Sequence, residues 1–247
     1  MNVFSPSTKP AHGDRLSIGG ADVRLRVDAR ARRVSIRLDT GKREFIATAP
    51  TERRLPEAVA FARSRAEWIA GLVARLPQSE GPAPGMTIQV LGLPVRLEAG
   101  PGRGRLEPGR IIAPAGARFA PTVMRLLKAE AKRALLERTA EYAQALGHPM
   151  PVVSIADPKS RWGSCRQPRK RGPHAGVEVG RIRYSWRLVL APYEVMDYVA
   201  AHECAHLVEA NHGPKFWAIV HQLVGPEKPH RAWLRANAGQ LHAFGGN

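Results

Sequence analysis

The spacing of apolar residues divides the chain into segments of strand and segments of helix. Between Ala21 and Ala49, apolar and polar positions alternate, a period that predicts strands with one buried face. From Leu55 to Leu76 the apolar residues recur at helical spacing, with Trp68 among those on the apolar side. This part of the chain is therefore predicted to hold several strands followed by one helix.

A second group of strands and a long helix follow. Met86–Leu97 predicts a hairpin around Gly92. Pro121–Leu146 predicts the longest helix, because it opens on a proline suited to a first turn and closes before a glycine. Further strands are expected at 152–156 and 182–188, and the sequence after Pro192 predicts helices at 192–210, 214–224 and 229–242.

These elements predict an α+β fold, with a mostly-β region first and a helix-rich region after it. We expect a flexible leader at residues 1–20, a strand-rich region with one helix at 21–118, and a helix-rich catalytic region at 119–247. The leader is polar and lacks the apolar core of a secretory signal. No stretch approaches the ~18 apolar residues that a membrane-spanning helix needs, so we expect a soluble protein.

The most informative motif lies in the helix that begins at Pro192. His202 and His206 are four residues apart, so they project from the same helix face and can bind one zinc ion together. Glu203 flanks that face, where it can accept a proton from a water molecule as a general base. The alternative is an ordinary helix with two unrelated histidines.

A third histidine favours the metal site. His212 follows Asn211 and precedes Gly213-Pro214, a turn sequence that can end the helix and bring His212 back toward His206. Three protein ligands with an open fourth position are typical of catalytic zinc. Glu209 is a weaker candidate for the third ligand. His221 and His230 are possible neighbours, although each is more often a plain surface residue.

Two cysteines occur near these positions. Cys204 lies on the opposite side of the helix from His202 and is expected to be a small core residue. Cys165 ends the segment Arg161-Trp162-Gly163-Ser164-Cys165, which is either a loop that lines the cleft, with Arg161 or backbone N–H groups facing developing negative charge, or a tight turn anchored by its Trp. No base can be assigned to Cys165, so it is not expected to be a nucleophile.

The amino-acid composition bears on the charge of the protein and on its cellular compartment. There are 38 Lys and Arg residues against 21 Asp and Glu, a net charge of +17 that suits a nucleotide or nucleic acid but is scattered along the whole chain. Two cysteines 39 positions apart do not form a disulfide framework, which favours a reducing cytoplasm.

The motifs together resemble the YgjP-like family of predicted zinc metallopeptidases, relatives of the SprT and WLM proteases. The matching segments are Lys159–Cys165, Tyr184–Pro192, Val195–His212, Phe216-Trp217 and Arg231–Leu234. The resemblance implies a zincin-like core with His202, His206 and His212 as zinc ligands and Glu203 as the base. The chain departs from the family pattern at two places. Cys204 stands where leucine is usual, and residues 167–178, which connect the Trp-Gly-Ser-Cys segment to the next strand, are longer and more basic.

Three functions follow, in order of preference. The first is zinc-dependent hydrolysis of a peptide or protein. The second is metal-dependent hydrolysis of a nucleoside triphosphate, an activity linked to members of the family and suited to the basic charge. The third is a nucleic-acid-associated protease or binding module, although the sequence contains no recognised nucleic-acid motif.

Overall fold

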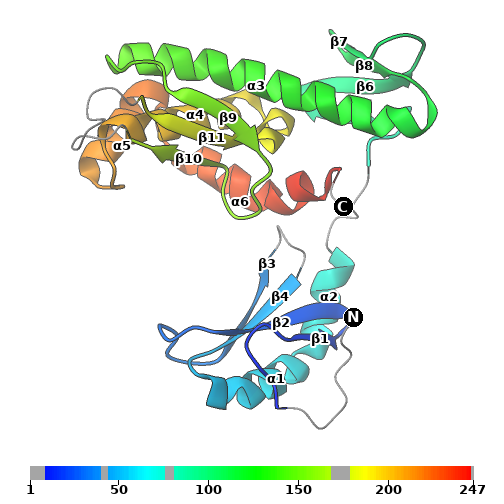
Figure 1. Cartoon of the computed structure of the whole chain (residues 1–247), viewed down its shortest axis with the longest axis vertical. Coiled ribbons are helices and arrows are strands. Elements are labelled where there is room, and N and C mark those ends of the chain that lie inside the picture. The colour runs from blue at the N-terminus through cyan, green and yellow to red at the C-terminus, as the bar shows by residue number, and fades with distance from the viewer. Residues whose placement is uncertain (1–8, 40–43, 76–80, 168–178, 246–247) are drawn as a thin grey trace. The chain divides into compact units, whose positions relative to one another are not determined.

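Figure 1 shows a computed structural model of the chain, which describes residues 9–39, 44–75, 81–167 and 179–245. The chain forms two compact units, Met1–Gln78 and Ser79–Asn247. Strands gather early and most helices come late, so the predicted α+β class is confirmed. Residues 168–178, most of the predicted basic link, lie outside the described residues.

The first unit is a four-stranded sheet covered by two helices. The strand order is β1-β2-β4-β3, and the only parallel pair among these strands is β2 with β4. The strands are β1 (Arg15–Ile18), β2 (Ala21–Val27), β3 (Ser35–Asp39) and β4 (Glu44–Ala49). Strand β1 therefore lies within the range expected as a leader. A short 3-10 helix (Glu52–Arg54) precedes α1 (Leu55–Ser64) and α2 (Ala66–Arg75), and both helices pack on this sheet.

The single helix predicted over 55–76 is two helices in the structure, interrupted at Arg65. The turn between β1 and β2 packs against this interruption: a Cβ added to Gly19 would lie 2.3 Å from the carbonyl oxygen of Ala66. Gly19 also has a φ of 58°, a backbone conformation that favours glycine. Residue 76, the predicted helix end, lies outside the described residues.

The second unit contains two sheets joined by one long helix. The sheet β5-β6-β8-β7 consists of β5 (Thr87–Val90), β6 (Leu93–Ala99), β7 (Arg105–Glu107) and β8 (Arg110–Ala113), and its β5–β6 hairpin confirms the prediction. After a 3-10 turn (Gly116–Arg118), α3 (Phe119–Ala145) packs its first half on this sheet and its second half on the helices beyond. Figure 1 shows α3 running along the whole unit.

The second sheet carries the segments that were singled out for chemistry. Its order is β10-β11-β9, with β9 (Val152–Ala156), β10 (Gly163–Arg166) and β11 (Arg181–Ser185), and β10 is antiparallel to β11. The loop and the tight turn considered for 161–165 are both wrong as secondary structure, since Gly163–Arg166 is an edge strand of this sheet. The helices α4 (Tyr193–Val208), α5 (Pro214–Val224) and α6 (Lys228–Ala243) complete the unit.

The strand predicted at Ile182–Leu188 is wrong in its second half. Strand β11 ends at Ser185, whose hydroxyl oxygen accepts a hydrogen bond from the Arg187 N–H at 3.4 Å, and Trp186–Leu190 forms a 3-10 helix. All five residues of this helix are buried. The alternation of apolar and polar residues that predicted a strand here therefore does not mark one buried and one exposed face.

Arg187 is a guanidinium in the core, with 1% of the residue exposed. It donates two hydrogen bonds to the Asp157 carboxylate, at 2.7 and 3.0 Å, and two to the carbonyl oxygens of Leu241 and Phe244, both at 2.6 Å. Burial raises the pKa of Asp157, but the hydrogen bonds and charge of Arg187 outweigh this and hold the pKa below its usual value. Arg187 thus joins the end of β9 to the end of α6.

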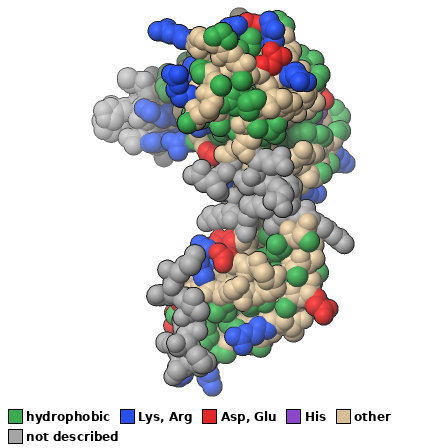
Figure 2. Space-filling model, turned by 90° about the vertical axis from the view of Figure 1, so that its right-hand side faces the viewer, with side chains coloured by type: hydrophobic (Ala, Val, Ile, Leu, Met, Phe, Trp, Pro, Cys, Tyr) green, Lys and Arg blue, Asp and Glu red, His purple; other side chains and the backbone are tan. Residues whose placement is uncertain are grey.

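No helix among the described residues has the length and apolarity needed to cross a membrane. Both cysteines are free thiols. On the face drawn in Figure 2, Lys and Arg side chains are spread over the surface of both units and do not form one continuous patch.

We expect Asp157→Ala to lower the free energy of unfolding by about 2–3 kcal/mol, because it leaves a buried guanidinium without its counter-charge. This loss of free energy is smaller than for a fully buried ion pair, because the Asp157 side chain is 38% exposed. Glu137→Ala, which removes an exposed ion pair with Arg133, is the control and should cost less than about 0.5 kcal/mol. Urea unfolding measures both.

The pKa of Asp157 is lowered in the folded state, so its stabilisation is present above the ordinary pKa of about 3.9 and is lost as the pH falls through the lowered value. The difference between wild type and Asp157→Ala should therefore shrink below about pH 4. Equal stability of the two proteins at pH 7 would contradict the role of this pair.

Candidate metal centre

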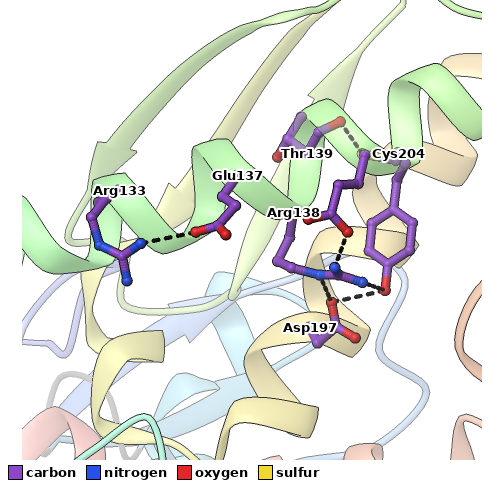
Figure 3. A network of polar contacts seen from close by, with 8 residues as sticks. Arg133, Glu137, Arg138, Thr139, Asp197 and Cys204 are labelled. Carbon is purple, nitrogen blue, oxygen red and sulfur yellow. Dashed lines mark hydrogen bonds and ion pairs between the residues drawn. The ribbon is translucent and has the colours of Figure 1, made fainter.

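Helix α4 is held in place by a polar network with α3. Arg138 of α3 donates to Asp197 of α4 at 2.5 Å, and the Tyr142 hydroxyl donates to the same oxygen at 2.8 Å. Figure 3 shows Arg138 and Asp197 between the two helices. Arg138 also pairs with Glu141. Ten of the sixteen residues of α4 are buried, so the helix that carries His202 and His206 is packed against its neighbours along most of its length.

The chain returns to this helix after α4 ends. Glu209 is extended (φ −122°, ψ 117°), the Gly213 N–H donates to the Asn211 carbonyl at 2.8 Å, and α5 begins at Pro214. This turn places His212 against α4. Its Nε2 atom lies 3.1 Å from Nε2 of His202 and 3.2 Å from Nε2 of His206.

The three imidazoles have the geometry of metal ligands. Zn–N bonds of ~2.0–2.1 Å in a tetrahedral site separate two ligand nitrogens by about 3.3–3.4 Å, close to the spacing seen here. Among the described residues, these three histidines form the one cluster of His, Cys, Asp or Glu that can hold a metal ion. The nitrogens present therefore fit a metal with an open coordination position.

Hydrogen bonds and burial prepare the imidazoles for this role. Nδ1 of His206 lies 3.0 Å from the Glu209 carbonyl, which can only accept, so Nδ1 carries the proton and Nε2 presents its lone pair. The Tyr198 hydroxyl lies 3.4 Å from Nδ1 of His202. Burial, followed by the neighbouring imidazoles, lowers the pKa of His202 to about 3, and burial also lowers the pKa of His206. Both rings are thus neutral at physiological pH.

Phe216 of α5 forms the floor beneath the three histidines. Its ring centroid lies 4.9, 4.4 and 4.7 Å from those of His202, His206 and His212, and the residue has no exposed surface. One aromatic ring therefore packs against every candidate ligand and limits how far each can rotate.

Glu203 is buried beside the histidines, with 5% of its surface exposed. Burial raises the pKa of its carboxyl group to about 8, and the charge of Arg161 opposes that rise. Gly163 of β10 makes room for it: a Cβ at this position would lie 2.4 Å from Oε1 and 2.7 Å from Cδ of Glu203. The backbone of β10 thus presses directly on the carboxylate.

The other residues considered from the sequence lie outside the cluster. The Glu209 carboxylate accepts from the Asn211 N–H at 3.4 Å, and His221 pairs with Glu227 at 2.6 Å. His230 stacks on Tyr198, with ring centroids 5.4 Å apart. Cys204 is fully buried, which confirms its place in the core.

Cys165 faces the site without the chemistry of a nucleophile. It lines the same cavity as His206 and His212. Burial, together with the nearby Glu203 charge, raises the pKa of its thiol to about 12, so the thiolate is scarcely formed at neutral pH. The expectation that it is not a nucleophile agrees with this shift.

Two cavities meet at Glu203 and His202. One has a volume of about 480 Å³ and is lined by residues 163–165 of β10 and by His206 and His212. The other has a volume of about 330 Å³ and is lined by Tyr198 and by arginines from α6 and from the segment before β10. Both include Gly163, so the candidate centre lies where they join.

Sequence reasoning missed several of these residues. Tyr198 precedes His202 by four positions, a spacing that places it on the same helix face. Arg231 and Arg235 are likewise four apart on α6. No local pattern marks Gly163 as a neighbour of Glu203, because the two residues are 40 positions apart.

The family comparison agrees with this arrangement. The model described as YgjP-like, metallopeptidase domain matches residues 32–237. The chain therefore belongs to the YgjP-like metallopeptidase family. No curated protein and no solved structure gave a significant match.

We expect Gly163→Ala to displace the Glu203 carboxylate, because the added methyl group overlaps it. Hydrolytic activity should fall by about 100-fold, since misplacing a catalytic group by about 1 Å has an effect of this size. Metal content should be unchanged. Gly71→Ala is the control, because a Cβ there has no heavy atom within 4 Å. Full activity in Gly163→Ala would show that the carboxylate position is not critical.

Proposed function

We propose that this protein is a zinc-dependent peptidase in which His202, His206 and His212 hold the metal and Glu203 is the general base. The observation that carries the proposal is the convergence of three imidazoles beside a buried carboxylate, with Nε2 of His212 3.1 Å from Nε2 of His202 and 3.2 Å from Nε2 of His206. Three imidazoles favour zinc over magnesium, which prefers carboxylate and water ligands. Membership in a metallopeptidase family supports the peptide substrate.

When bound, zinc would polarise the scissile carbonyl and make an attacking water molecule more acidic. Glu203 takes the proton from that water at its carboxylate and then delivers it to the nitrogen of the departing amine. Burial raises the pKa of this carboxyl group, which makes its ionised form a stronger proton acceptor than an exposed glutamate. Gly163 and the β10 backbone exclude solvent from one side of the carboxylate.

The arginines beside the centre favour a second candidate, hydrolysis of a nucleoside triphosphate. Assays of peptides and of nucleoside triphosphates with Zn²⁺, Mg²⁺ and Mn²⁺ on the same preparation separate the two. A nucleic-acid partner predicts binding that weakens steeply with salt, since neutralised phosphates release counterions. The two free cysteines support a reducing cytoplasm as the place of action.

Purified protein should contain one zinc ion per chain, and His212→Ala should bind zinc at least about 100-fold more weakly, because it removes one of three ligands. His221→Ala is the matched control on the neighbouring helix, since its ring pairs with Glu227 outside the cluster. Elemental analysis and competition with a chelator measure both variants. Equal zinc affinity in His212→Ala and wild type would remove His212 from the ligand set.

Glu203→Gln should lower kcat by about 100- to 10,000-fold while zinc stays bound, because an amide cannot accept the proton from water. Glu194→Gln, an exposed change in the first turn of the same helix, should leave kcat unchanged. Cleavage of an unstructured protein and of a fluorogenic peptide mixture provides the readout. An unimpaired Glu203→Gln enzyme would overturn the mechanism.

A further inference from the structure

The smaller of the two cavities beside the candidate centre concentrates positive charge. Arg161 reaches it from the segment before β10, and Arg231 and Arg235 reach it from successive turns of α6. Among the described residues, Glu203 is the one acidic residue in its lining. Three guanidinium groups therefore share a cavity of about 330 Å³ with a single carboxylate.

Little else in the described structure neutralises these arginines. Arg161 and Arg235 make no hydrogen bond or ion pair with any described residue. Arg231 lies 4.0 Å from a Glu227 oxygen, beyond hydrogen-bond distance, and its Cζ stands 5.4 Å from the centroid of the Trp217 ring. The Trp217 ring therefore supports Arg231, while the guanidinium N–H groups of Arg231 have no hydrogen-bond acceptor among the residues that the structure describes.

The rest of the lining is suited to a short carbon chain. Tyr198, Val199 and Leu234 are buried residues that add apolar surface to the cavity lining. The volume is at the low end of the range for small-molecule sites, which is enough for one amino-acid residue. Guanidinium groups bind carboxylates through paired, charge-assisted hydrogen bonds.

We propose that this arginine pocket, lined by Arg161, Arg231 and Arg235, binds a carboxylate of the substrate and directs the enzyme to acidic peptides. The inference rests on the proposed peptidase function and specifies its substrate class. The carboxylate comes either from an Asp or Glu side chain next to the scissile bond or from the C-terminus of the peptide. Both sources present the same group to the same guanidinium groups.

The neighbourhood of the pocket favours a peptide over a nucleotide. A nucleoside triphosphate would bring several negative charges next to the Glu203 carboxylate, whereas a peptide brings one. The second cavity, of about 480 Å³, continues the path along the β10 backbone on the other side of the centre. An extended chain that crosses the histidines can therefore fill both cavities, with its acidic group among the arginines.

The test uses the zinc-loaded full chain and a fluorogenic decapeptide. One Glu is moved through every position, a matched series carries Gln, and each peptide is made with a free and with an amidated C-terminus. We expect Glu at one position, or the free C-terminus, to raise kcat/KM by about 10-fold or more over its neutral counterpart. The first result identifies a side-chain carboxylate and the second a terminal one.

Arg161→Gln and Arg235→Gln should bring this preference ratio close to one. Both residues are exposed, so both variants should fold, and thermal unfolding verifies that they do. Arg125→Gln, an exposed arginine of α3 outside the pocket lining, removes the same charge and should keep the ratio of the wild type. Raising the salt concentration should lower the preference in the wild type.

Equal cleavage of acidic and neutral peptides, or a preference that survives in both pocket variants, would overturn the proposal. If no peptide is cleaved, the peptidase function fails and the pocket is tested by binding. Calorimetry of zinc-loaded Glu203→Gln with the Glu and Gln decapeptides then supports the pocket only if the Glu peptide binds more tightly and Arg235→Gln removes the difference. Calorimetric binding of a nucleoside triphosphate, with no difference between the Glu and Gln peptides, identifies a nucleotide site instead.

Discussion

The buried guanidinium of Arg187 connects the parts of the second unit that frame the candidate centre. It binds Asp157 after β9 and two carbonyl oxygens at the end of α6, and it stacks on Trp186 with Cζ 4.7 Å from the ring centroid. A buried charge is tolerated here because the guanidinium group is paired with a carboxylate and donates four hydrogen bonds. The segment that follows Asp157 leads directly to Trp162, whose ring stacks on His242 of α6. The residue just before β10 is thereby held against the end of α6.

The centre is preorganised from three directions. Helix α4 is tied to α3 by Asp197 and Arg138, Phe216 packs beneath the three imidazoles, and β10 presses on Glu203 from the other side. These contacts hold the donor atoms close together, an arrangement suited to metal binding. The same rigid frame leaves the two cavities open on either side of the histidines.

Much of this centre could be predicted from the sequence, because its key spacing is local. Helical periodicity places His202 and His206 on one face, and the turn residues after Asn211 explain the return of His212. The α+β class and the long helix follow from apolar periods that extend over many residues. The strand–helix boundary at Ser185 could not be predicted, since Trp186–Leu190 is buried on all sides and alternation carries no information there.

The other features of the centre depend on tertiary contacts and could not be predicted from the sequence. The contact of Gly163 with Glu203 and the gathering of Arg161 with Arg231 and Arg235 join segments that are 40 or more positions apart. Neither has a local signature, because a glycine in a strand and an arginine on an exposed helix face are common for many reasons. Their significance is visible only once the fold has brought them together.

The contact between β10 and Glu203 also has an evolutionary consequence. The glycine of the Trp-Gly-Ser-Cys segment and the glutamate of the His-Glu-x-x-His segment occupy adjoining volumes, so they form one steric unit encoded in two places. A descendant that gains a side chain at residue 163 can keep this backbone only by retracting the acid at residue 203, and a shorter acid moves away from the histidines. The two segments should therefore be inherited together, and a chain with only one of them is expected to have diverged in its chemistry.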